Sequence, residues 1–124
     1  MTGRAARPVA TPARRVLWAC IEDYAGLWEL RWELNGLYGG PGADGHLAQA
    51  RDLARRFLAQ GWVEAYWCEE PYGELSPVAA EDLGSRAQLL DDDARWEAPE
   101  PGTRGVRLSA TEAGEQAYAA GERR

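Results

Sequence analysis

The 124 residues are enough for one domain with its own core, without a disulfide or metal to stabilise it. Hydrophobic residues make up 45% of the chain and the formal net charge is −6, as in an acidic globular protein. No apolar run is long enough to cross a membrane, and the N-terminus lacks the apolar segment of a secretory signal, so we expect a cytoplasmic protein.

The first twelve residues, 1–12, are interpreted as a disordered basic arm, because prolines and small residues dominate them. Residues 1–15 carry four arginines and no acid. Residues 64–100 carry eleven acids and only two arginines. This separation of charge indicates different partners for the two stretches.

Two helices are predicted after the arm. Between residues 16 and 28, apolar side chains recur at spacings of three and four, as on one face of a helix. Gly26 interrupts this run, and glycine is unfavourable inside a helix. We therefore predict helices near 13–25 and 27–36, with a joint at the glycine.

A third helix is predicted over residues 45–60, after a turn-rich stretch. Asp44 is placed to cap the free N–H groups at its start. Gly61 suits the left-handed conformation that ends many helices. The next segment, "WVEAYWC" at residues 62–68, has the composition of a strand.

Residues 69–104 are rich in acids, turns and prolines. The pair Ser76-Pro77 is typical of a helix start, so a short helix is predicted over 78–90. Its inward-facing residues are expected to be Ala79, Leu83 and Leu90. An acidic, proline-marked loop follows.

The last part of the chain is predicted to form a strand and a helix. "GVRLS", residues 105–109, fits a short strand that returns to the sheet. "SATE", Ser109 to Glu112, matches the capping-box pattern that opens a helix, here over 111–120. Residues 13–121 are therefore predicted to be a single domain.

Two cysteines and one histidine leave little basis for metal chemistry. Cys20 and Cys68 lie far apart, neither has a second cysteine at metal-binding spacing, and His46 stands alone. We interpret both cysteines as small buried hydrophobic residues and expect no metal and no other cofactor.

The predicted order of elements is similar to that of a winged helix-turn-helix domain. Two segments resemble the PadR and MarR families of transcriptional regulators, and a third resembles the PadR family. The resemblance touches about half of the chain, of which the three segments themselves make up 38 residues. "AGLWELRWEL" (25–34) resembles the PadR second helix, "LARRFLAQGWVEAYW" (53–67) the third helix and first wing strand, and "VRLSATEAGEQAY" (106–118) the return strand and last helix.

The resemblance implies a mainly α fold with a small β-wing, in the α+β class. The families have a short wing, whereas more than thirty residues separate the two strands here, and many are acidic. Thr111 supplies the threonine that opens the last helix, one residue later than in the families. We therefore expect a winged helix-turn-helix domain with a long acidic insertion, residues 69–104, between the wing strands.

The first hypothesis for function is a DNA-binding transcriptional regulator. In the families' binding mode the third helix enters the major groove, and the arm and the wing add groove and phosphate contacts. The residues implicated are His46, Gln49, Arg55 and Arg56 on the third helix, Arg14 and Arg15 near the arm, and Arg104 and Arg107 at the wing base. The alternative is that the helix arginines are only a solvated face, which Asp52 in its middle favours.

The second hypothesis is a protein-interaction module on the same scaffold, because a fold does not determine a function. The acidic stretch of residues 69–100 would bind a basic partner, such as a toxin that the protein neutralises or another regulator. Its candidate contacts are Tyr72, Asp91, Asp92, Asp93 and Trp96. The simpler interpretation is a solvated acidic loop with one anchoring tryptophan. By family analogy a homodimer is also expected, through Tyr118 and the tryptophans of the first helices.

We predict that the protein is not an enzyme. Glu22 and Asp23 are neighbours in a helix and do not face one another. The run Asp91 to Asp93 lacks the spaced ligands of a calcium-binding loop, and one histidine provides no Ser/His/Asp set.

Overall fold

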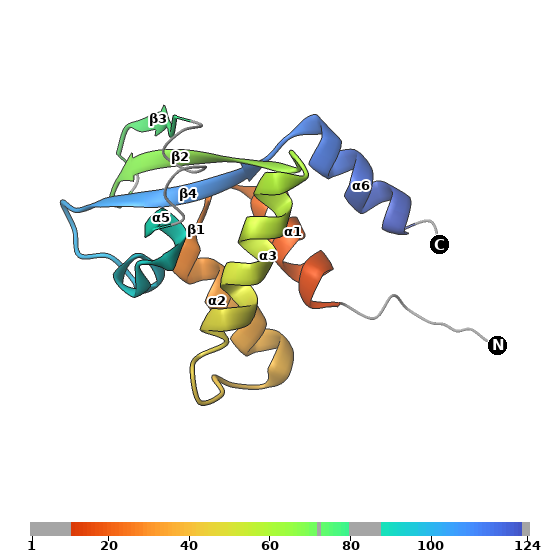
Figure 1. Ribbon diagram of the computed structural model, residues 1–124, viewed down its shortest axis with the longest axis horizontal. Coiled ribbons are helices and arrows are strands. Elements are labelled where there is room, and N and C mark those ends of the chain that lie inside the picture. The colour runs from red at the N-terminus through yellow and green to blue at the C-terminus, as the bar shows by residue number, and fades with distance from the viewer. Residues whose placement is uncertain (1–10, 72, 80–87, 123–124) are drawn as a thin grey trace.

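A four-stranded antiparallel sheet and the helices that pack against it form an α+β protein (Figure 1). The structure is a computed structural model that describes residues 11–71, 73–79 and 88–122. Helices α1, α2 and α3 gather on one side of the sheet, and α6 extends from the end of β4. Among the described residues, no helix has the length and apolar character needed to cross a membrane.

Helix α1 spans Pro12–Glu22, so the predicted arm is too long at its C-terminal end. Thr11 caps this helix, because its hydroxyl oxygen accepts a hydrogen bond from the Arg14 backbone N–H at 3.1 Å. Proline is tolerated in the first helical turn, since its missing N–H has no partner there. Residues 1–10, the rest of the predicted arm, lie outside the described residues.

The predicted joint at Gly26 is confirmed. Strand β1 (Ala25–Gly26) separates α1 from α2 (Leu27–Tyr38). The Gly26 backbone N–H donates to Glu29 Oε1 at 2.7 Å, which satisfies a free group at the start of α2. A Cβ atom at Gly26 would lie 2.0 Å from the Trp28 ring, so the close approach requires glycine.

Helix α3 spans Leu47–Ala59, close to the predicted range. Asp44 accepts hydrogen bonds from the backbone N–H groups of His46 and Ala48, at 2.9 and 3.3 Å. The hydrogen bond from Ala48 in particular lowers the pKa of Asp44. Gly61 has a φ of +74° and ends the helix as predicted.

The sheet has the strand order β1-β4-β2-β3. Strands β2 (Val63–Glu69) and β4 (Arg104–Ala110) confirm the two predicted strands, and they pair with Ala65 opposite Leu108. β1 pairs with β4 on the other side, with Ala25 opposite Leu108. The sheet thus contains β1, which lies between α1 and α2, together with β2 and β4, the two strands of the predicted wing.

The predicted helix start at Ser76-Pro77 is wrong, because both residues belong to edge strand β3 (Leu75–Pro77). Ser76 lies opposite Trp67 of β2 in an antiparallel hairpin. Proline is acceptable there because an edge strand does not need every N–H for the ladder. Ala79 is exposed rather than inward-facing, and Leu90 is buried as predicted. Leu83 lies outside the described residues.

In the part of the chain described between β3 and β4, there are two short helices, namely α5 (Gln88–Asp91) and the 3₁₀ helix η1 (Asp93–Trp96). After β4, α6 spans Glu112–Glu122 and confirms the last predicted helix. Its cap is Thr111, whose hydroxyl oxygen accepts from the Gly114 backbone N–H at 3.1 Å. Ser109 lies in β4, so the predicted capping role of Ser109 is wrong.

The core lies between the sheet and helices α1 to α3. Its largest fully buried side chains are Trp96, Phe57, Leu27, Leu30, Leu34 and Leu108. Cys20 and Cys68 are both buried and unpaired, as predicted. Burial raises the pKa of the Cys20 thiol to about 12.

Candidate nucleic-acid interface

The outer face of α3 is the first candidate site. The residues that turn toward the core are Ala50, Leu53, Ala54 and Phe57. The opposite face exposes Asp52, Arg55 and Arg56, and Arg51 is half-buried at its edge. The 3.6-residue period of the apolar positions therefore directs the arginines outward or to the side.

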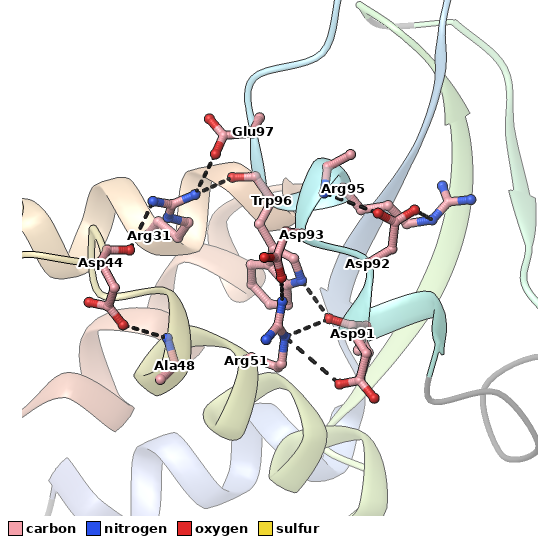
Figure 2. Close-up of polar contacts among 12 residues, drawn as sticks. Arg31, Asp44, Ala48, Arg51, Asp91, Asp92, Asp93, Arg95, Trp96 and Glu97 are labelled. Atoms are coloured by element: carbon pink, nitrogen blue, oxygen red, sulfur yellow. Dashed lines mark hydrogen bonds and ion pairs between the residues drawn. The ribbon is translucent and has the colours of Figure 1, made fainter.

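Two arginines on one edge of α3 contact residues 90–97, which we call the acidic segment. Figure 2 shows the first of them, Arg51, beside Asp91 and Asp93. Arg51 Nη2 donates to Asp93 Oδ1 at 2.5 Å. One turn later, Arg55 pairs with Asp91. Two of the aspartates expected to bind a basic partner therefore pair with arginines of the protein itself, and one of these is a predicted DNA contact.

Buried residues hold the acidic segment on both sides of its aspartates. Trp96 is 1% exposed and Leu90 is 4% exposed. The Leu90 carbonyl oxygen accepts hydrogen bonds from Trp96 Nε1 and Arg51 Nε, each at 2.7 Å. Arg31 Nη1 donates to the Trp96 carbonyl oxygen at 3.1 Å (Figure 2). Trp96 is thus a core anchor, and its ring is not on the surface where a partner contact was expected.

The remaining aspartate of the segment, Asp92, serves η1 rather than α3. Its Oδ1 accepts from the Ala94 backbone N–H at 3.1 Å, and its Oδ2 lies 3.8 Å from Arg95 Nε (Figure 2). Asp92 therefore caps the 3₁₀ helix. Tyr72, the other predicted contact for a basic partner, lies outside the described residues.

The predicted DNA contacts at the start of α3 are joined to the end of α2. The His46 ring stacks on Tyr38 with centroids 4.7 Å apart, and its Nδ1 lies 2.7 Å from Asn35 Oδ1. Gln49 Oε1 accepts a hydrogen bond from the Tyr38 hydroxyl at 3.0 Å. Both side chains therefore meet the same tyrosine at the N-terminal end of the α3 surface.

Arg56 and Arg104 both lie at the surface. Arg56 Nη1 is 3.6 Å from Asp52 Oδ2, one turn earlier on the same exposed face. Arg104, at the start of β4, places its guanidinium 4.2 Å from the Trp67 ring centroid. Exposed pairs of this kind are weak, so both cations stay accessible to an anionic ligand.

Arg14 and Arg15 belong to α1, within the range predicted to be helical. Arg14 Nη1 donates to the Tyr118 carbonyl oxygen at 3.0 Å, and its guanidinium lies 3.8 Å from the Tyr118 ring centroid. Arg15 Nε donates to Glu33 Oε1 at 2.7 Å. These contacts connect α1 to α6 and to α2, which gives both arginines a structural role.

Arg107 is inside the protein, although the sequence predicts a phosphate contact for it. Its Nη2 and Nε donate to the two carboxylate oxygens of Glu70, at 2.7 and 3.1 Å, and its Nη1 donates to the Tyr24 carbonyl oxygen at 2.7 Å. Burial by itself would lower the pKa of Arg107, but the hydrogen bonds and charge of Glu70 outweigh burial and raise the pKa.

An open pocket of about 660 Å³ lies between α3, β2, β3 and α5. Its walls are mainly apolar, with Arg55, Glu64 and Tyr66 as the polar groups. The Tyr66 hydroxyl donates to Glu64 Oε1 at 3.1 Å. In the described ranges, no three histidine, cysteine, aspartate or glutamate side chains are grouped to hold a metal ion.

Arg51 makes the central contact to the acidic segment, although it was not among the site residues predicted from the sequence. The sequence signal that could have identified Arg51 is its spacing of four residues from Arg55, which places both side chains on one edge of the helix.

Comparisons with protein-family models, curated proteins and solved structures find no match to this chain. Its function is therefore inferred from the residues and their geometry.

Proposed function

We propose that the chain is a non-enzymatic winged-helix protein that binds DNA through α3 and acts as a transcriptional regulator. The observation that carries this proposal is the connectivity around the sheet. Elements α1, β1, α2 and α3 lead directly into β2, and β4 returns between β1 and β2. The succession of three helices, strand β2, returning strand β4 and a last helix supports the proposed winged-helix arrangement with β2 and β4 as wing strands, whereas β1 and β3 were not expected from the resemblance.

The chemistry of α3 supports the same proposal. Its outer face carries Arg55 and Arg56, and Gln49 lies toward its N-terminal end. Guanidinium and amide groups are the side chains that read base edges in the major groove, and guanidinium groups also bind phosphates. Arg104 adds a surface cation on β4.

A titration with fluorescent duplex DNA tests this proposal. The duplexes are pooled from the genomic neighbourhood of the protein's own gene, and binding is measured at about 50 and 200 mM salt. We expect sequence-selective binding that weakens at the higher salt, because released counterions drive phosphate contacts. No binding at the lower salt, where the electrostatic contribution is strongest, would contradict the proposal.

A second candidate, a protein-interaction module, is favoured by a different surface. Trp18 on α1 and Trp32 on α2 are 43% and 58% exposed, although most tryptophans bury much of their area. Glu22, Asp23 and Trp32 line one hollow between these helices. Exposed tryptophans beside acids suit a protein partner with basic groups, or a second copy of the chain. Sedimentation of the protein with and without Trp18→Ala and Trp32→Ala would reveal such self-association.

A further inference from the structure

We propose that the acidic segment lowers the DNA affinity of α3, because its carboxylates occupy the arginines that phosphates would otherwise bind. This inference rests on the proposed function and concerns the regulation of the same site. Its basis is the contact of Asp91 and Asp93 with Arg55 and Arg51.

The pair of Arg55 and Asp91 is exchangeable. Both side chains are about half exposed, so water and salt screen their attraction. A guanidinium that binds one carboxylate with its outer nitrogen offers the same geometry to a phosphate oxygen. Phosphate and Asp91 therefore compete for one cation on the outer face of α3.

Arg51 differs from Arg55, because it is fixed in place. Its side chain is only 20% exposed, and its Nε donates to the Leu90 carbonyl oxygen. The remaining arm of the guanidinium reaches Asp93 at the surface. Arg51 therefore stays with the segment and holds Asp93 beside α3.

A small movement of the acidic segment cannot take the carboxylates of Asp91 and Asp93 away from α3. Leu90 and Trp96 are buried on either side of the aspartates, and Arg31 binds the Trp96 carbonyl oxygen (Figure 2). The carboxylates of Asp91 and Asp93 consequently remain near α3 even when Arg55 turns to another anion. They then repel an approaching phosphate across a short distance.

The charges on this surface are balanced as a result. The arginines are Arg51, Arg55 and Arg56, and the facing aspartates are Asp52, Asp91 and Asp93. Helix α3 carries several arginines in the sequence, but its surface in the folded protein has little excess positive charge. Removing charge from the acidic segment should restore that excess without altering α3.

The test compares the wild type with Asp91→Asn/Asp93→Asn in the duplex DNA titration at two salt concentrations. Asparagine keeps the size of aspartate and removes its charge. We expect the variant to bind roughly tenfold more tightly at the lower salt, with a salt slope steeper by about one unit, because one more arginine becomes free to meet a phosphate. DNA binding that appears only in the variant would support the inference as well.

The matched control is Glu74→Gln/Glu100→Gln, which removes the same two charges from the β2–β3 turn and from the loop before β4. A gain as large in the control as in the aspartate variant would show an effect of net charge and overturn the inference. Wild-type binding without any gain in the aspartate variant would overturn the inference and leave the proposed function standing. No DNA binding by any of the proteins would overturn both.

A second comparison separates electrostatics from loss of structure. Asp91→Asn alone keeps the contact between Arg51 and Asp93, and its expected gain is about threefold. Adding Arg55→Gln to Asp91→Asn should abolish that gain, since Arg55 is the released cation. A gain that persists without Arg55 would contradict the proposed exchange.

Discussion

Glu70 and Arg107 form a two-pronged ion pair inside the protein, with both carboxylate oxygens of Glu70 engaged and with exposures of 4% and 7%. Tyr24 contributes its carbonyl oxygen to the same guanidinium. The pair joins the end of β2 to β4 and to the segment before β1. Removing Glu70 would take away both charge-assisted hydrogen bonds of this pair, although Glu29 Oε1 stays 3.6 Å from Arg107 Nη1.

Glu70→Ala should lower the free energy of unfolding by about 3 kcal/mol, because the buried Arg107 loses its two-pronged partner and keeps the more exposed Glu29 at 3.6 Å. Urea unfolding followed by tryptophan fluorescence measures the change. Glu69→Ala is the matched control, since the neighbouring Glu69 is exposed and should cost less than about 1 kcal/mol. If Glu70→Ala lowered the free energy of unfolding as little as Glu69→Ala does, the ion pair would contribute little to stability.

The three tryptophans at positions 96, 62 and 32 should differ in importance according to their burial. Trp96→Ala removes a fully buried ring and its hydrogen bond to Leu90, so we expect a loss of about 3–5 kcal/mol. Trp62 is only partly buried and should cost less, and Trp32→Ala should change stability by about 0.5 kcal/mol or less. Thermal unfolding of the three variants checks this order, and a costly Trp32→Ala would contradict it.

Local signals in the sequence predicted much of the fold. The apolar periodicity and the two glycines at positions 26 and 61 placed α1, α2 and α3 to within a few residues. Strand β1 was missed, because its two residues acquire strand geometry only by pairing with β4. Likewise, the local helix signal at Ser76-Pro77 yields to the pairing of β3 with β2.

The candidate site was harder to predict, because its contacts join distant parts of the chain. Arg55 and Asp91 are 36 residues apart, and no periodic pattern reports such a pair. Side chains along β4 alternate between the two faces of the strand, so Arg107 lies on the face opposite to that of Val106 and Leu108. The face that carries Arg107 is nevertheless covered, because the Trp28 ring and Glu70 both contact its guanidinium.

Burial of Cys20 predicts a thiol that does not react in the folded protein. Its pKa is raised from 9.0 to about 12, so the thiol is protonated at pH 8. In a Cys68→Ala variant, Cys20 is the sole thiol, and iodoacetamide should modify it only after denaturation. Fast modification of the native variant at pH 8 would contradict this prediction.

The same shift predicts how stability depends on pH. The folded-state pKa of Cys20 lies above that of the unfolded chain, so folding favours the protonated thiol. Its contribution to stability is fully present below pH 9 and is lost as the pH rises from 9 toward 12. Urea unfolding of wild type and Cys20→Ala across this range should show a steeper decline for the wild type, and parallel declines would contradict the assignment.

The accessible arginines of α3 provide the most direct check on the proposed function. Arg55→Ala with Arg56→Ala removes two exposed cations and should weaken duplex DNA binding, with a salt slope smaller by about one to two units. Stability should change little, because both side chains lie on the solvent-exposed face of α3.

Arg95→Gln is the control for this prediction, because it removes one arginine from η1 and leaves the α3 surface intact. It should alter DNA affinity less than Arg56→Gln, the matched single change on α3. Fluorescence anisotropy with one duplex at two salt concentrations measures all four proteins. If Arg95→Gln and Arg56→Gln weaken binding equally, the DNA contact is governed by total charge, and α3 is not the reading helix.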